Sequence, residues 1–204
     1  MTLPAVILAG GLSSRMGGGD KVLLELNGQP LLAHVIARLA PQVGPLAISA
    51  NGDPARFARF GLPVLADSLP DFPGPLAGVL AAMDWAAGFG AASVLTAAGD
   101  TPFPPHDLAA RLQAAGAQGL ALAADRDSAG EARLHPTFGL WPTALREDLR
   151  AALAEGLRRP RQWAARHQAG TAIFDGPEPF FNINTPADLA HASAASANVP
   201  SARW

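Results

Sequence analysis

Short apolar runs that alternate with helical patterns constrain the fold of this 204-residue chain more than any other feature. Four runs of the length of one buried strand occur in the first half, at residues 5–9, 46–50, 63–66 and 93–98. Between the first two, Leu32, Val35 and Leu39 repeat at helical spacing. Strands joined through helices run parallel, and strands that are apolar throughout are covered on both faces. The sequence therefore predicts an α/β fold of three layers, with a mostly parallel central sheet and helices on both faces.

The second half of the chain continues this pattern less regularly. Strands are predicted at residues 119–124, 135–140 and 171–174, and helices at 105–115, 142–153 and 161–167. The polar stretch 125–132 is expected to be a mobile loop. A last short helix contains Asp188, and the Ala/Ser-rich tail that follows is expected to be flexible. The expected organisation is one domain over residues 1–192 with a flexible tail over 193–204.

Composition excludes several classes of function. The absence of cysteine excludes disulfides, thiolate metal sites and a cysteine nucleophile, and fits a cytoplasmic protein. A formal net charge of −2 argues against a nucleic-acid partner. The long apolar stretch 76–98 contains Asp84 and a Gly88-Phe89-Gly90 break, so no membrane partner is expected either.

A glycine-rich loop follows the first strand. It starts at Gly10-Gly11, contains Arg15 and ends at Asp20-Lys21. Glycines let a backbone turn its N–H groups toward an anion, and two cations add charge, so the loop suits a polyphosphate. Neither the P-loop pattern nor the dinucleotide G-x-G-x-x-G pattern fits these residues.

Polar residues follow the other predicted strands directly. Gly10, Asn51, Asp67 and Asp100 each come after an apolar run, and they should meet at the carboxyl edge of one parallel sheet. Asp100 beside a triphosphate could hold Mg²⁺, together with phosphate oxygens and waters. Asp67 could accept the N1–H and N2–H₂ donors of guanine. Asn51 is a weaker candidate for a nucleotide contact, and Ser49 could take its place.

The opening stretch resembles the signature of the nucleotidyltransferases, and most closely the molybdopterin (molybdenum cofactor) guanylyltransferase family. The matching residues are Leu8-Ala9-Gly10-Gly11, Arg15-Met16-Gly17 and Lys21. Four later stretches also resemble family motifs: Pro73 to Gly78, which follows Asp67; Gly99 to Pro102; His135-Pro136-Thr137; and Asn182 to Pro186. The resemblance extends over nearly the whole chain.

The resemblance implies a Rossmann-like nucleotidyltransferase fold and an enzyme that transfers GMP from Mg-GTP to the terminal phosphate of molybdopterin, releasing pyrophosphate. It implies catalytic roles for Arg15, Lys21 and Asp100, with Asp100 binding the Mg²⁺ cofactor. The implied GTP contacts are Leu8, Ala9, Gly10, Gly11, Lys21, Asn51, Asp67 and Asp100. His135, Asn182 and Asn184 are assigned to the acceptor or metal side of the cleft.

Two roles stay open at this point. Arg158, Arg159 and Arg161 form either a solvated face or a site for a pterin phosphate. Asp20 either pairs with Lys21 or Arg15, or supports a metal ligand.

Other functions also remain as alternatives. A cytidylyltransferase or sugar-phosphate nucleotidyltransferase shares this type of loop, although cytidylyl relatives tend to read L-A-A-G where this chain has Leu8-Ala9-Gly10-Gly11. A nucleotide-binding module without catalysis is the alternative from another class. The expected partners are GTP, molybdopterin or Mo-molybdopterin, and molybdoenzyme-maturation proteins, and the expected state is a monomer.

Overall fold

The computed structural model of the chain describes residues 2–10, 20–68 and 74–197. The strands are β1 (Ala5–Leu8), β2 (Glu25–Leu26), β3 (Gln29–Pro30), β4 (Leu46–Ser49), β5 (Val64–Leu65), β6 (Ser93–Ala98), β7 (Ala121–Arg126), β8 (Ala132–Pro142) and β9 (Gly170–Ile173). The α-helices are α1 (Leu31–Leu39), α2 (Pro75–Ala87), α3 (Leu108–Ala115), α4 (Arg146–Ala154), α5 (Pro160–Arg166) and α6 (Pro186–Ala197). Short 3₁₀ helices lie at Lys21–Leu23, Ala40–Gln42, Pro54–Phe60 and Thr143–Leu145.

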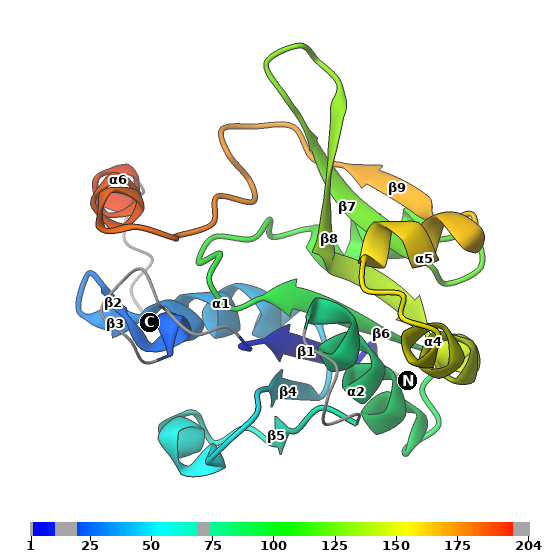
Figure 1. Ribbon diagram of the computed structural model, residues 1–204. Coiled ribbons are helices and arrows are strands. Elements are labelled where there is room, and N and C mark those ends of the chain that lie inside the picture. Colours follow the sequence, from blue (N-terminus) through cyan, green and yellow to red (C-terminus); the bar gives the residue numbers. More distant parts are fainter. Residues whose placement is uncertain (1, 11–19, 69–73, 198–204) are drawn as a thin grey trace.

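The central sheet has seven strands in the order β5-β4-β1-β6-β8-β7-β9. Strands β5, β4, β1 and β6 are parallel neighbours, as the alternation of strand and helix predicts. Strand β9 lies parallel to β7, while β8 runs antiparallel to both of its neighbours, β6 and β7. The predicted fold class, a mostly parallel sheet between helices, is therefore confirmed (Figure 1).

The loop predicted at residues 125–132 is present but shorter than expected, over residues 127–131. Strand β7 extends to Arg126, and β8 begins at Ala132, so most of this stretch is the tip of a β-hairpin. The turn is closed by the Asp127 carboxylate, which accepts the backbone N–H groups of Ala129 and Glu131 at 2.9 Å each. The polar composition thus indicated the loop correctly, and the Asp127 side chain also stabilises it by bonding within the hairpin.

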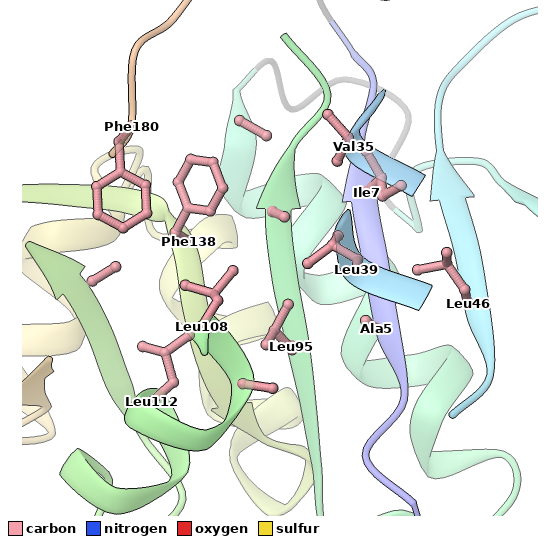
Figure 2. Close-up of a cluster of buried hydrophobic side chains, with 14 of the residues drawn as sticks. Ala5, Ile7, Val35, Leu39, Leu46, Leu95, Leu108, Leu112, Phe138 and Phe180 are labelled. Carbon is pink, nitrogen blue, oxygen red and sulfur yellow. The ribbon is translucent and has the colours of Figure 1, made fainter. Parts of the chain in front are cut away.

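The two faces of the sheet carry separate apolar clusters because side chains alternate along each strand. Ala5 and Ile7 of β1 lie in one cluster, with Val35 and Leu39 of α1 (Figure 2). The same cluster includes Leu108 and Leu112 of α3. Side chains of α2, α4 and α5 form the other cluster, against the opposite face of the sheet. The helices thus make the two outer layers of the predicted sandwich.

A third, smaller cluster lies beside α1, where the β2–β3 hairpin and α6 meet (Figure 1). Its fully buried members are Leu26, Leu31 and Ile183, with Ala192 nearly so. The hairpin turns at Asn27-Gly28, as the sequence suggests, and both residues have positive φ angles as a type I′ turn requires. Helix α1 starts at Leu31, directly after Pro30, which is the last residue of β3.

Helix α6 continues to Ala197, five residues beyond the boundary expected at residue 192. Residues 198–204 of the expected tail lie outside the described residues. Among the helices of the described part, none is both long and apolar enough to cross a membrane.

Candidate functional site

Four of the predicted site residues lie at the same edge of the sheet. Leu8 pairs with Ser49 and with Ala98, and Ser49 pairs with Leu65, so four strands end in register. Gly10, Asn51, Asp67 and Asp100 each come two residues after one of these ends. Along the edge they follow the strand order Asp67, Asn51, Gly10, Asp100. A crevice outside the carboxyl ends of parallel strands is the usual place for a ligand in such a sheet.

Lys21 joins three of the predicted residues. Its Nζ lies 2.6 Å from Asp100 Oδ2, 3.0 Å from Asn182 Oδ1 and 2.5 Å from Asn184 Oδ1. An ammonium group has three N–H donors, and here each has one oxygen acceptor. The Lys21 side chain is only 13% exposed and that of Asp100 22%, so this contact is partly shielded from water. The structure therefore brings the strand end of β6 together with a segment 82 to 84 residues later in the chain.

The segment that carries the two asparagines is anchored between them. The backbone N–H of Ile183 donates to the carbonyl of Asp100 at 3.0 Å, and the Ile183 side chain is fully buried in the third cluster. Directly after it, the Asp188 carboxylate accepts the backbone N–H groups of Asn184 and Thr185 at 2.8 Å each. These bonds, with the one from Asn184 the largest cause, lower the pKa of Asp188. Asn182 and Asn184 are thus held in place by backbone and core contacts, independently of Lys21.

Asn51 and Asp67 form a reciprocal pair. The Asn51 amide Nδ2 donates to Asp67 Oδ2 at 2.6 Å, and the backbone N–H of Asp67 donates to Asn51 Oδ1 at 2.9 Å. Asn51 therefore orients the Asp67 carboxylate. Ser49, the other candidate, is 4% exposed and lies so close to α2 that a Cβ on Gly78 would sit 2.9 Å from its Oγ. This burial favours Asn51 over Ser49 as the group at the surface of the edge.

Asp20 has a partner that the sequence did not indicate. Its Oδ2 lies 2.5 Å from Arg56 Nε, and Arg56 also donates to the backbone carbonyls of Asn51 and Asp53 at 2.5 Å each. Asp20 thus ties the end of the opening loop to the loop after β4, and Lys21, one of the partners that the sequence left open, bonds Asp100 instead. No sequence pattern links Arg56 to Asp20, since 36 residues separate them.

The first strand contributes backbone groups to the edge, and some of them are already used within the sheet. The carbonyl of Leu8 accepts the N–H of Gly99 at 3.0 Å, and the N–H of Ala9 donates to the carbonyl of Ser49 at 2.9 Å. Gly10 is exposed. Gly11 and Arg15, the remaining predicted residues of this loop, lie outside the described residues.

A pocket of about 420 Å³ lies next to the Lys21 contacts. Asn182 contributes to both, and His135 lines the pocket as well. The His135 ring packs on Phe180, with 4.5 Å between the ring centroids, and its Nε2 lies 3.0 Å from Asp125 Oδ1. Asn184 does not line this pocket; its side-chain oxygen accepts a hydrogen bond from Lys21.

The pocket also contains groups that the sequence did not single out, namely Arg133, Leu134, Glu178, Phe180 and Phe181. Arg133 donates two hydrogen bonds to the Asp125 carboxylate, from Nε to Oδ1 at 2.9 Å and from Nη2 to Oδ2 at 2.6 Å. The Arg133 hydrogen bond is the main cause that lowers the pKa of the buried Asp125 carboxyl. Arg133 lies two residues before His135 on one strand, so period-2 spacing from a predicted site residue is the signal that could have found it.

The basic cluster in the last third of the chain has a structural role at its first member. Arg158 donates through Nη1 to the backbone carbonyl of Leu153 in the last turn of α4, at 2.7 Å, and to that of Leu157 beyond the helix, at 2.9 Å. Arg159 and Arg161 are exposed to solvent.

The donor set around Lys21 is also suited to a hard cation. Within the described residues no three Asp, Glu, His or Cys side chains cluster as a metal site would. However, one carboxylate oxygen and two amide oxygens converge within 3.0 Å of a single positive charge. Oxygen ligands of this type, few in number and completed by phosphates and water, are what Mg²⁺ uses in nucleotide sites.

Comparison with known proteins identifies the family. The MobA-like NTP transferase domain matches residues 5–171. The chain belongs to this family. The molybdenum cofactor guanylyltransferases of Bradyrhizobium sp. (strain ORS 278) and Cereibacter sphaeroides are 49% and 54% identical to the chain, covering 96% and 95% of it and 93% and 97% of their own lengths.

A solved structure agrees in fold. The molybdopterin-guanine dinucleotide biosynthesis protein A of Archaeoglobus fulgidus superposes with a TM-score of 0.71 at 21% identity, covering 97% of this chain and all of that one. The resemblance of the opening stretch is thus confirmed, and the chain is a nucleotidyltransferase. The names of the two relatives favour guanylyl transfer over the cytidylyl and sugar-phosphate alternatives, and over a non-catalytic module.

Proposed function

We propose that this chain transfers GMP from Mg-GTP to the terminal phosphate of molybdopterin, forming the guanine dinucleotide form of the cofactor and releasing pyrophosphate. In the reaction, an oxygen of the acceptor phosphate attacks the α-phosphorus of GTP, and the bond between that phosphorus and the bridging α–β oxygen breaks. The acceptor is already an anion, so the step requires positioning and charge stabilisation and no protein nucleophile.

The observation that carries the proposal is the position of Lys21. One ammonium group touches Asp100 at the strand edge, where the triphosphate would lie, and Asn182, which lines the adjacent pocket. An acceptor phosphate in the pocket and the α-phosphate at the edge would thus meet beside a fixed positive charge. Lys21 can exchange its oxygen contacts for phosphate oxygens and stabilise the charge that moves onto pyrophosphate.

Asp100 is the residue that would hold Mg²⁺, together with phosphate oxygens and water, and the ion would supply further neutralisation of the phosphate charge. Asn182 and Asn184 offer amide oxygens beside it. Arg15 keeps its predicted role on the phosphates, outside the described residues. Leu8 to Gly11 are proposed to contact the nucleotide through backbone groups, principally from Gly10 onward, where the sheet no longer uses them.

Asp67 is proposed to read the base. Guanine presents two adjacent donors to a carboxylate, whereas adenine and cytosine each place a ring-nitrogen acceptor there. Because Asn51 already holds Oδ2, the orientation of the carboxylate is fixed before the nucleotide binds. A charged group left without its donors costs several kcal/mol, which corresponds to a preference of about a thousandfold.

The pocket lined by Arg133, His135 and Phe180 is proposed as the acceptor site. Its aromatic rings suit a flat pterin, and the Arg133 guanidinium suits a phosphate. Mg²⁺ as the specific metal, molybdopterin as the acceptor and a cytoplasmic location all belong to this proposal. The same holds for a monomeric state and for the expectation that neither nucleic acid nor a membrane is a partner.

The test is pyrophosphate release from GTP, CTP, ATP and UTP, each with and without molybdopterin. Of the four nucleotides, we expect only GTP to release pyrophosphate, and only when molybdopterin is present. Release from CTP at a similar rate would support the cytidylyl alternative, and nucleotide binding without release would support the non-catalytic module. In Asp67→Ala the GTP preference should collapse; an unchanged preference would show that the base is read elsewhere.

A further inference from the structure

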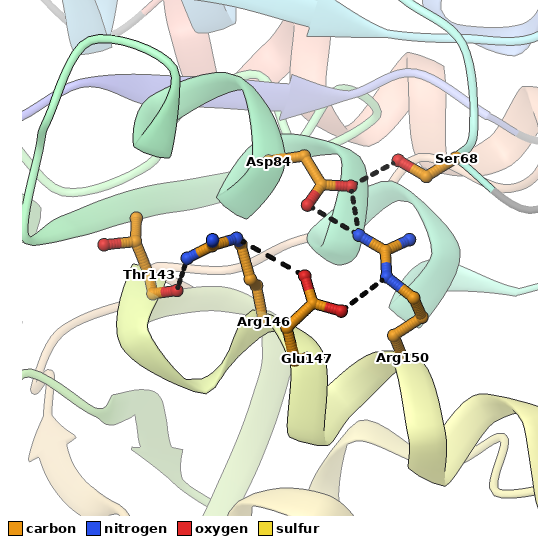
Figure 3. Close-up of polar contacts among 6 residues, drawn as sticks. All are labelled: Ser68, Asp84, Thr143, Arg146, Glu147 and Arg150. Carbon is orange, nitrogen blue, oxygen red and sulfur yellow. Dashed lines mark hydrogen bonds and ion pairs between the residues drawn. The ribbon is translucent and has the colours of Figure 1, made fainter.

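A network of polar side chains outside the site includes Ser68, the residue after Asp67. Ser68 donates from Oγ to Asp84 Oδ2 at 2.7 Å, and Asp84 accepts Nη2 of Arg150 at both carboxylate oxygens, 2.8 Å from Oδ1 and 3.0 Å from Oδ2 (Figure 3). Arg150 is held in turn by Glu147, whose Oε2 accepts its Nε at 3.1 Å. This network of side chains thus connects the loop after β5 with α2 and then with α4.

A carboxylate at position 84 is unfavourable for the stability of helix α2. It lies in the last turn of α2, which ends at Ala87, near the negative end of the helix dipole. Aspartate is also a poor helix former. Arg150 compensates for both disadvantages, and the bond to Asp84 is the main cause that raises the pKa of Arg150. The Asp84 carboxylate is therefore stabilised by hydrogen bonds from outside the helix, and Ser68 donates one of them.

Asp67 is held from two sides as a result. Asn51, from the loop after β4, bonds its backbone N–H and its carboxylate. On the other side, the following residue is tied to α2 through Asp84. We propose that Ser68 and Asp84 are positioning residues that fix the orientation of the Asp67 carboxylate and thereby sharpen the preference for guanine. The inference rests on the proposed function, in which Asp67 reads the base.

A variant of Arg150 can distinguish this positioning role from a purely structural one. Its contacts link α2 to α4 and do not include Ser68. Loss of Arg150 should therefore weaken helix packing while the hydrogen bond from Ser68 to Asp84 can persist. Loss of the Ser68 hydroxyl should do the opposite, because Ser68 is exposed and contributes little to the core.

The readout is the ratio of kcat/KM for GTP to that for ITP. Inosine lacks the N2 amine, so this ratio reports how well a carboxylate meets the two adjacent donors of guanine. We expect Ser68→Ala to lower the ratio about fivefold, mainly through a raised KM for GTP, with kcat nearly unchanged. Ser68→Thr keeps a hydroxyl and should restore the ratio. Arg150→Met is the matched control: it should lower the melting temperature and leave the ratio at its wild-type value.

A double variant tests the link itself. If Ser68 acts through Asp84, Ser68→Ala combined with Asp84→Ala should lower the ratio no further than either change alone. A wild-type ratio in Ser68→Ala, while Asp67→Ala loses the preference, would overturn this inference and leave the proposed function standing. A wild-type ratio in Asp67→Ala would instead overturn the assignment of base reading to Asp67.

Discussion

Ile183 offers a test of how the site is held together, because it touches no proposed substrate. It lies between the two asparagines that bond Lys21 and is fully buried beside Leu26 and Leu31. Its backbone N–H donates a hydrogen bond to the backbone carbonyl of Asp100. Ile183→Ala should therefore reduce stability and, in addition, loosen Asn182 and Asn184.

The size of both effects follows from these contacts. Removing three buried carbons costs about 3 kcal/mol, since each buried methylene contributes about 0.8 kcal/mol and a cavity remains. For a chain of this size the melting temperature should fall by roughly 6–12 °C. Two hydrogen bonds to a charged group become less well placed, at a cost of about 2 kcal/mol, so kcat/KM should fall about thirtyfold.

Leu112→Ala is the control, because Leu112 in α3 is equally buried and loses the same three carbons. Thermal unfolding and guanylyl transfer would be measured for both variants at a temperature at which both are folded. We expect similar losses of stability, but a loss of activity only in Ile183→Ala. Equal activity in the two variants would refute the argument that Ile183 positions the asparagines.

Three further outcomes are expected. Asp100→Asn should abolish Mg-dependent turnover while circular dichroism shows an intact fold; normal activity would remove Asp100 from the metal site. Lys21→Ala should lower kcat about a hundredfold, or by about 3 kcal/mol, and weaken GTP binding less, as steady-state kinetics can show; a raised KM with unchanged kcat would mean uniform binding instead. Asp125→Asn should cost about 2 kcal/mol of unfolding free energy in urea at pH 7, because Arg133 lowers the pKa of Asp125 in the folded state. Since a lowered pKa stabilises the fold above the ordinary pKa of aspartate, the wild type should lose this advantage as the pH falls below about 4, and a difference that persists at low pH would contradict the reasoning.

The edge of the sheet could be predicted from sequence because its logic is local. A buried parallel strand is recognisable from its apolar run, and whatever follows it must emerge at the carboxyl edge. Asn51, Asp67 and Asp100 lie there for that reason. The turn at Asn27-Gly28 was predictable in the same way, because few residues adopt positive φ angles at two successive positions.

Contacts between distant segments could not be predicted from the residues alone. Nothing local distinguishes Arg56 as the partner of Asp20, or Arg150 as the partner of Asp84. The extension of β7 and β8 beyond the predicted strands 119–124 and 135–140 was missed, because this part of the hairpin is stabilised by side-chain bonds, from Asp127 and between Arg133 and Asp125, and not by apolar alternation. The resemblance assigned Asn182 to the cleft but did not indicate its contact with Lys21. That contact depends on the burial of Ile183 in the third cluster, which brings the segment to the edge of the sheet.

The most direct measurement follows the phosphorus atoms of GTP. The purified chain would be incubated with Mg²⁺, molybdopterin and GTP labelled either at the α- or at the γ-phosphate, and the pterin product would be separated from nucleotide. The account predicts that α-label enters the pterin product in one-to-one proportion with pyrophosphate, and that γ-label appears in pyrophosphate only. Appearance of γ-label in the pterin, or release of pyrophosphate with no label in the pterin, would contradict it.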